Sequence, residues 1–178
     1  MTDDIESGTD EVDDAQRTSS QRVQAAFLEN YVPAQYAFVQ FLSEHLLDCR
    51  RSVGGDLDDV MLLAVLGQRL LAARINPGQG LADSRDRDWT SALRIADVTG
   101  IPRESVRRKL NRLAERGWVT HDPAQGWALA GSHDMVAAKT DLSDLDRRAI
   151  ERLGKLVASL LPLLAKGRSA PTASAGPP

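Results

Sequence analysis

The sequence predicts a mainly α-helical fold that contains one small β-hairpin. Apolar residues recur at three- and four-residue steps over residues 21–75 and 143–166, which is the spacing of amphipathic helices. Between these regions, residues 89–130 hold two shorter helix patterns separated by a glycine, and then two short apolar segments separated by turn-forming residues. Helix, tight turn, helix and hairpin in this order are the plan of a winged helix-turn-helix, here with further helices on both sides.

The N-terminal helical region is expected to contain two interruptions. Pro33 should break or kink the run of apolar residues near Tyr31, because proline lacks the N–H that a helix interior needs. Val53-Gly54-Gly55 should end the run, and Asp56 stands where a cap would start a further helix. These helices carry more apolar residues than one small winged domain can cover, so a subunit interface or a ligand pocket between helices would use the surplus.

A tight turn is expected between the two shorter helices. Gly100 can adopt the left-handed conformation that ends the first of them. Ile101 should then fill the angle between the helices. Pro102 suits the start of the second helix, where its missing N–H is not required. Because Ser, Thr or Asp often stands at this position, we expect a weak cap at Pro102, or one supplied by water or a phosphate.

The second of these helices, residues 103–116, is amphipathic and basic. Val106, Leu110 and Leu113 fall on one stripe that should face the core. Glu104, Arg107, Arg108 and Asn111 fall on the opposite face, with Arg103 beside them. Six basic and two acidic residues give the helix a charge of +4: Arg103, Arg107, Arg108, Lys109, Arg112 and Arg116 against Glu104 and Glu115.

The outer face of this helix has the chemistry that reading the DNA major groove requires. Arginine can bond to O6 and N7 of guanine, asparagine can bond to N6 and N7 of adenine, and Glu104 can accept from N4 of cytosine or orient a neighbouring arginine. For an isolated helix a solvated basic face would be the better explanation, but the preceding helix, the glycine turn and the hairpin favour nucleic acid. We therefore expect the DNA-binding residues to be Arg103, Glu104, Ser105, Arg107, Arg108, Asn111, Arg112, His121 and Gln125.

A small hairpin, the wing, should follow the basic helix. Two apolar segments, Trp118-Val119 and Trp127-Ala128-Leu129, flank residues 122–126, which are typical of a turn. His121 and Gln125 lie at or near the tip, where a wing meets the minor groove or the phosphates beside it. Because the tip carries no lysine or arginine, we predict that the wing contributes weakly to binding.

This segment resembles bacterial winged-helix transcription regulators, and most closely those of the MarR type. The matching residues cover about a quarter of the chain: Ile95-Ala96, Gly100, Ser105-Val106, Arg108, Leu110, Leu113 and Gly117-Trp118-Val119. The pattern is specific for the winged helix-turn-helix and weak for any one family. It is also similar to the DNA-binding end of cyclic-nucleotide-responsive regulators, but no glycine-rich β-barrel pattern precedes it here. In MarR-type proteins the flanking helices pair two subunits, so the resemblance implies a homodimer.

The composition divides the chain into six segments with different expected roles. We expect an acidic disordered tail (1–20), a helical segment for dimerisation or a pocket (21–75), a loop (76–88), the winged DNA-binding domain (89–130), a second helical segment (131–166) and a disordered C-terminal tail (167–178).

The formal net charge of −3 conceals an uneven distribution along the chain. The first twenty residues hold seven acidic residues and one basic residue, so the rest of the chain carries +3. An acidic protein can therefore still present a basic DNA-binding face. The acidic tail either has no role or shields that face when DNA is absent.

No pattern of residues indicates catalysis. His45, His121 and His133 are scattered, no cysteine or carboxylate stands at a ligand spacing from them, and no phosphate-binding loop is present, so we expect no enzyme, cofactor or metal. The single Cys49 excludes an internal disulfide and suits a reducing compartment. The acidic start is not a signal peptide and no apolar run is long enough to span a membrane, so a bacterial cytoplasmic protein is expected.

The predicted function is sequence-specific transcription regulation, with the helix over residues 103–116 in the major groove of double-stranded DNA. A second copy of the chain is the other expected partner, and a small-molecule effector is a further one if the apolar surplus forms a pocket. The alternative is a winged-helix module that binds proteins without specific DNA binding, because a fold does not fix a function. Steep salt dependence of duplex binding would separate the two.

Overall fold

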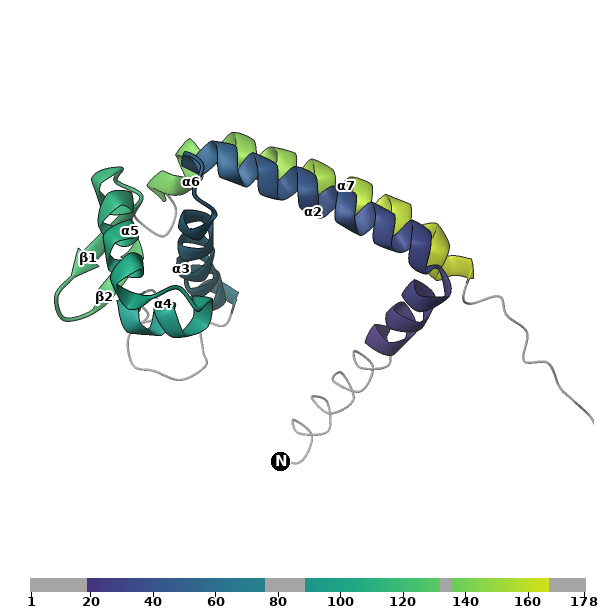
Figure 1. Cartoon of the computed structure of the whole chain (residues 1–178), viewed down its shortest axis with the longest axis horizontal. Helices are drawn as coiled ribbons and strands as arrows, with labels where there is room; N and C mark the ends of the chain where they lie inside the picture. Colours follow the sequence, from purple (N-terminus) through teal and green to yellow (C-terminus); the bar gives the residue numbers. More distant parts are fainter. Residues whose placement is uncertain (1–18, 76–88, 132–135, 167–178) are drawn as a thin grey trace, which may run out of the picture. The chain divides into compact units, whose positions relative to one another are not determined.

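The computed structural model describes residues 19–75, 89–131 and 136–166 and confirms the mainly helical fold with one hairpin (Figure 1). A helical stretch over residues 19–29 comes first. It is followed by α2 (Tyr31–Val53), α3 (Leu57–Ile75), α4 (Ala92–Thr99), α5 (Arg103–Glu115), β1 (Val119–Asp122), β2 (Gly126–Leu129), α6 (Ala137–Asp141) and α7 (Ser143–Lys166). The expected tails (1–20 and 167–178) and loop (76–88) lie outside the described residues, except that residues 19 and 20 are helical.

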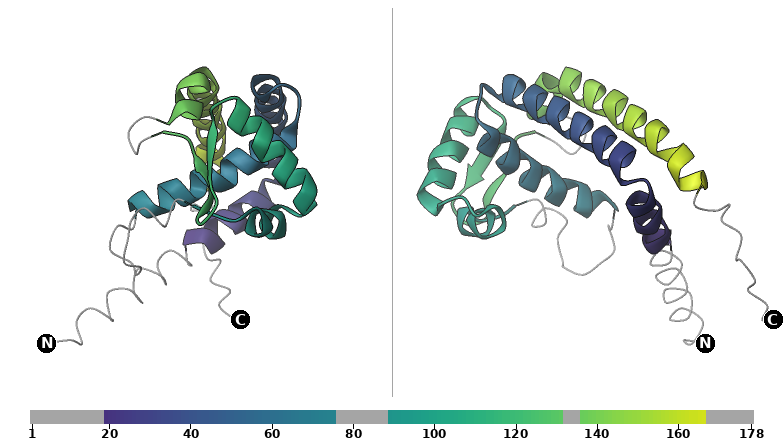
Figure 2. Two further views of the ribbon diagram at one scale, coloured as in Figure 1. Left: turned by 90° about the vertical axis from the view of Figure 1, so that its left-hand side faces the viewer. Right: turned by 45° about the vertical axis from the view of Figure 1, so that its right-hand side comes forward.

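The chain divides into two compact units. The first takes in Met1–Glu44 and Ile150–Pro178, and the second takes in His45–Ala149. In the first unit α2 and α7 lie side by side (Figure 2) and are joined by an ion pair of 3.7 Å between Arg152 Nε and Glu44 Oε2. The interruption predicted near Tyr31 is present as a turn at Asn30, and α2 then begins with Pro33 in its first turn.

The turn between α2 and α3 forms where the glycines predict it. Gly54 and Gly55 have φ values of 93° and 100°, a region in which side chains cause strain, so α2 ends at Val53. Asp56 follows and its Oδ1 accepts from the backbone N–H of Asp58 at 3.1 Å, at the first turn of α3. The sequence placed Asp56 at this helix start, and the structure confirms that position.

The core of the second unit combines α3 with the helix-turn-helix and the hairpin. Leu62 and Leu66 of α3 are fully buried in one cluster with core residues of the following elements: Ile95, Val106, Leu110, Leu113, Trp118, Val119 and Trp127. The sequence grouped α3 with the N-terminal helices in a segment ending at residue 75. Its buried face instead makes α3 part of the second unit, residues 45–149, which we call the winged unit. Apolar spacing reveals which face of a helix is buried but not which element covers it.

The helix-turn-helix has the predicted geometry. Ser91 caps α4 by accepting from the N–H of Arg94 at 3.1 Å. Gly100 adopts the left-handed conformation with φ 71°, and its N–H donates to the carbonyl of Ala96. Ile101 packs against the core, and Pro102 begins α5 without a side-chain cap, as the sequence predicted.

The hairpin after α5 pairs β1 with β2 in antiparallel register, with His121 opposite Trp127. At the tip, Asp122 Oδ1 accepts from the N–H groups of Ala124 and Gln125 at 2.8 and 2.9 Å. Thr90 forms an additional bridge to Trp127 through two backbone hydrogen bonds of 2.9 and 2.8 Å, which the sequence did not reveal. This bridge ties the start of the helix-turn-helix to the wing.

Gly126 is required where the hairpin meets the Thr90 bridge. Its φ of 102° lies in the region that favours glycine. A Cβ atom at this position would also lie 2.5 Å from the carbonyl oxygen of Thr90. Because that neighbour is backbone held by hydrogen bonds, it cannot move aside at low cost.

Candidate nucleic-acid interface

The helix α5 presents two chemically distinct faces. Val106, Leu110 and Leu113 are fully buried, as predicted from their spacing. The residues expected to meet DNA are exposed, except Ser105, which is half-buried: Arg103, Glu104, Arg107, Arg108, Asn111 and Arg112. Glu104 forms an exposed ion pair of 3.4 Å with Arg107, one turn further along the helix.

Five of the nine predicted residues line a single groove between α5 and the hairpin. Arg103, Arg107 and Asn111 come from the outer face of α5, and His121 and Gln125 come from the wing. The groove has a volume of about 360 Å³ and extends to Ser91 and Ala92 at the start of α4. The helix-turn-helix and the wing therefore place guanidinium, amide and imidazole groups along one surface. Arg108 is exposed outside this groove, and no described carboxylate pairs with it.

An aromatic contact supports the wing side of the groove. The ring of His121 lies 4.4 Å from the ring of the buried Trp127, its partner in the hairpin register. The Asp122 hydrogen bonds fix the turn that carries Gln125. The tip has no cationic side chain of lysine or arginine, in keeping with its sequence.

Lys109 and Arg112, two of the basic residues of α5, reach the start of α3 and form a cluster of charges with it. The Lys109 side chain is only 8% exposed, and its ammonium group donates to Asp56 and lies 3.2 Å from Asp58 Oδ2. Arg112 donates to Asp56 at 2.9 Å and to both oxygens of the buried Asp59 at 2.6 and 2.8 Å. We call these five residues the Asp56–Arg112 cluster.

The pKa values in the cluster reflect this pairing. The hydrogen bond from Lys109 lowers the pKa of the Asp56 carboxyl to about 2 from its ordinary 3.8, and Arg112 lowers it further against the opposing effect of burial. Burial lowers the pKa of Lys109, but the hydrogen bonds to Asp56 and Asp58 outweigh it and raise that pKa above 10.5. Hydrogen bonds to Asp56 and Asp59 raise the pKa of Arg112. Asp56, Lys109 and Arg112 are therefore ionised at neutral pH.

Arg116, the last basic residue of the predicted helix, is also engaged within the fold. Its Nη1 donates to the carbonyl of Val53 at 2.8 Å, and its guanidinium carbon lies 3.6 Å from the centre of a Trp118 ring. Trp118 in turn donates from Nε1 to Asp141 at 2.7 Å. Lys109, Arg112 and Arg116, three of the six basic residues of this segment, thus bind partners elsewhere in the fold. The helix charge of +4 did not reveal this.

Histidine and cysteine chemistry is limited in the described part of the chain. Those residues contain no group of three or more His, Cys, Asp or Glu side chains that could hold a metal ion. Cys49 Sγ lies 3.5 Å from His45 Nε2 one turn away on α2, so the sequence-based statement that no cysteine stands at such a spacing from a histidine was wrong. None of the described helices combines the length and the apolar character needed to cross a membrane.

Comparison with known protein families supports the helix-turn-helix assignment. Residues 83–123 match the IclR helix-turn-helix domain, and this stretch includes α4, α5 and β1. The segment is thus a helix-turn-helix of the kind with which transcription regulators bind DNA, and DNA-binding regulation is the function the match indicates. The matching family is IclR and not MarR, so the predicted class was right and the predicted family was wrong. No curated protein and no solved structure matches the chain.

The MarR resemblance rested on features that winged helix-turn-helix domains share. The buried stripe of α5, Gly100 in its turn and the Gly117-Trp118-Val119 entry to the hairpin follow from packing requirements of the motif. Residues set by packing define a fold class, whereas the exposed residues that distinguish families follow no such rule.

Proposed function

We propose that the protein is a sequence-specific regulator that binds double-stranded DNA with α5 in the major groove. The groove that gathers Arg103, Arg107, Asn111, His121 and Gln125 on one surface is the observation that carries this proposal. The family match over residues 83–123 supports it independently. An α-helix fits the major groove, and arginine and asparagine are the side chains that read guanine and adenine there.

The exposed residues then take different roles. Arg107 and Asn111 read bases, and Arg103 and Arg108 contact bases or phosphates. Glu104 orients Arg107 through their ion pair or accepts from cytosine. Ser105, half-buried on the first turn of α5, suits a phosphate contact, and His121 and Gln125 supply a weaker wing contact. The sequence places Arg112 among the DNA-binding residues, but its guanidinium group is held by Asp56 and Asp59, so we propose that its main role is to position α5.

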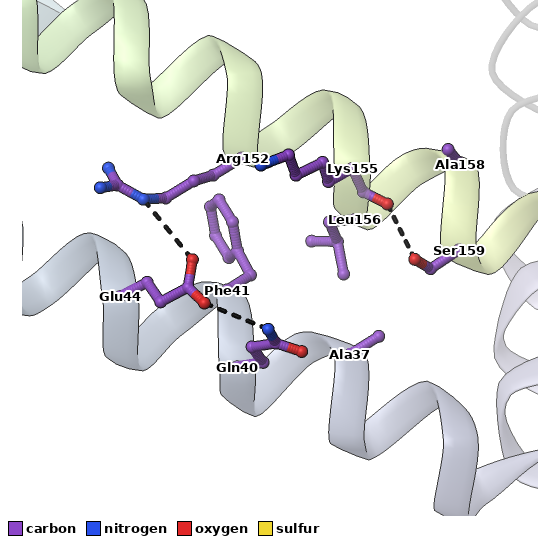
Figure 3. Close-up of a pocket in the computed structure, with 9 residues that line it drawn as sticks. All are labelled: Ala37, Gln40, Phe41, Glu44, Arg152, Lys155, Leu156, Ala158 and Ser159. Carbon is purple, nitrogen blue, oxygen red and sulfur yellow. Dashed lines mark hydrogen bonds and ion pairs between the residues drawn. The ribbon is translucent and has the colours of Figure 1, made fainter.

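We further propose that two copies of the chain form a homodimer through α2 and α7. Ile150, Leu153, Val157 and Leu161 form one exposed apolar stripe along α7, with steps of three and four residues. On α2, Val32, Tyr36 and Val39 are exposed as well. Figure 3 shows that Phe41 and Leu156 occupy the facing sides of the two helices, so the exposed residues are a second apolar surface. Exposed stripes of this extent mark interaction sites.

A dimer also fits the demands of DNA recognition. A single winged domain buries a small interface with DNA, whereas two winged domains related by a two-fold axis read half-sites about one helical turn apart.

A substitution on α7 tests the proposed dimer interface. Val157→Glu places a charge on the stripe, and we expect it to convert a dimer into a monomer in sedimentation at micromolar concentration. The matched control is Ser159→Glu, which adds the same charge on the groove side drawn in Figure 3 and should leave the dimer intact. A wild-type monomer at concentrations that bind DNA would contradict the dimer.

DNA binding itself is tested by selecting genomic fragments with purified full-length protein and measuring affinity for the preferred site against salt. Neutralised phosphates release counterions, so each lost phosphate contact lowers the salt slope by about 1. We expect Arg108→Gln to lower the slope by about this amount per half-site if Arg108 meets a phosphate. Arg116→Gln removes the same charge from a residue that binds Val53 and should leave the slope unchanged. Binding without salt dependence would favour the protein-interaction alternative.

A further inference from the structure

A second cleft lies within the winged unit, away from the proposed DNA surface. It has a volume of about 320 Å³ and shares no lining residue with the groove between α5 and the wing. Its walls are mainly apolar and come from α3, the end of β2, and the segment from α6 to α7: Leu63, Leu70, Leu129, Val136, Ala138 and Leu142. A volume near the lower limit of ligand pockets, with apolar walls, suits a small molecule.

A glycine in the middle of α3 helps to form this cleft. Gly67 lines it, and a Cβ atom built there would meet no atom within 4 Å. Glycine inside a helix is less favourable than alanine, and neither a close neighbour nor a positive φ requires it at this position. The missing side chain therefore leaves space in the cleft without being needed for the backbone.

Charged residues surround the apolar walls. Arg74 from α3 and Lys139 from α6 line the cleft together with Asp146 from α7, and all three are exposed. No ion pair joins any of them to a described residue. Two cations and one anion around an apolar space favour a ligand with an apolar body and a negative head group, because arginine and lysine donate charge-assisted hydrogen bonds to carboxylates.

We propose that this cleft binds a small apolar carboxylate. The ligand body fills the space beside Gly67, and its carboxylate meets Arg74 and Lys139 at the rim. This site would give the protein a small-molecule ligand that contacts both α3 and the end of the wing. The inference rests on the cleft and not on DNA binding, and its tests contain no DNA, so the two proposals can fail separately.

The probe is octanoate, with 1-octanol as the uncharged control of equal chain length. We expect octanoate to bind the full-length protein with a Kd on the order of 1 mM or tighter, which is the affinity that a ligand of about ten heavy atoms can reach. The control should bind at least roughly tenfold more weakly, because it lacks the charge that pairs with the rim. In methyl-labelled protein the shifted resonances should be those of Leu63, Leu70, Leu129 and Val136. Equal binding of both probes, or shifts elsewhere, would overturn the proposal.

Two sets of variants locate the binding site. Gly67→Leu fills the cleft and should weaken octanoate binding by at least about tenfold, whereas Gly154→Leu, at an equally open helical glycine of α7, should not. The double variant Arg74→Gln, Lys139→Gln changes only exposed side chains, and should weaken octanoate about tenfold while leaving 1-octanol within about twofold. Unchanged octanoate affinity in either the Gly67 variant or the double variant would refute the assigned site.

Discussion

Replacement of Asp59 by asparagine should destabilise the winged unit by about 2 kcal/mol. The Asp59 side chain is 2% exposed, and both of its oxygens accept from Arg112. Asparagine keeps the shape but loses the charge and places an amide donor against a donor. Hydrogen bonds to charged groups contribute about 1.5–3 kcal/mol. The larger loss of about 3–5 kcal/mol seen for an abandoned buried charge does not apply, because Arg112 is 51% exposed and keeps Asp56 as a partner.

The control is Asp58→Asn in the same cluster. Asp58 is 48% exposed and lies 3.2 Å from Lys109, so its ion pair is screened by water and should contribute less than about 1 kcal/mol. Urea unfolding gives both free energies, and in thermal unfolding the Asp59 variant should lose roughly 4–8 °C of Tm. Equal losses of unfolding free energy in the two variants would refute the argument that burial determines how much each carboxylate contributes to stability. A loss below about 0.5 kcal/mol for Asp59→Asn would refute it as well.

Three other predictions concern pH, base reading and the wing. The pKa of Asp56 is lowered to about 2, against 3.8 in an unfolded chain, so its carboxylate stabilises the fold above about pH 4 and this gain is lost as pH falls through about 2. The Tm difference between wild type and Asp56→Asn should therefore shrink from about pH 6 to pH 2, and a constant difference would contradict the stabilising role of the Asp56 carboxylate. Asn111→Ala should cost roughly 1–3 kcal/mol at the preferred DNA site and relax its specificity, which unchanged binding in a competition assay would exclude. Replacement of Ala124–Gln125 by Gly-Gly should reduce DNA affinity less than Arg107→Ala does, because the tip has no basic residue, and the reverse order would show that the wing dominates.

Local chemistry explains the features that the sequence predicted well. Gly100 ends α4 because a left-handed residue is needed there, and Gly54-Gly55 ends α2 for the same reason. The period of apolar residues identified the buried face of α5, and the hairpin followed from two apolar segments around a turn. In each case the residues that determine the structure lie within a few positions of one another.

Features that depend on distant residues were not predictable in the same way. Lys109 and Asp56 are 53 positions apart, and no periodicity connects them. The bridge from Thr90 to Trp127 joins residues 37 positions apart, and Gly126, whose φ is 102°, lies directly beside it. The place of α3 in the winged core depends on which apolar faces meet, and many pairings satisfy the same pattern.

The difference between contacts of neighbouring residues and contacts of distant residues matters for the candidate DNA surface. The sequence assigns six basic residues to α5 and its end, but Lys109, Arg112 and Arg116 bind Asp56, Asp59 and Val53 within the fold. Arg103, Arg107 and Arg108 are those that remain on the outer face of the helix. The three residues bound within the fold fix the orientation of α5, and the three on the outer face are available to a ligand. Because recognition requires side chains held in a defined orientation, a helix that divides its basic residues in this way is better suited to read bases than one that exposes them all.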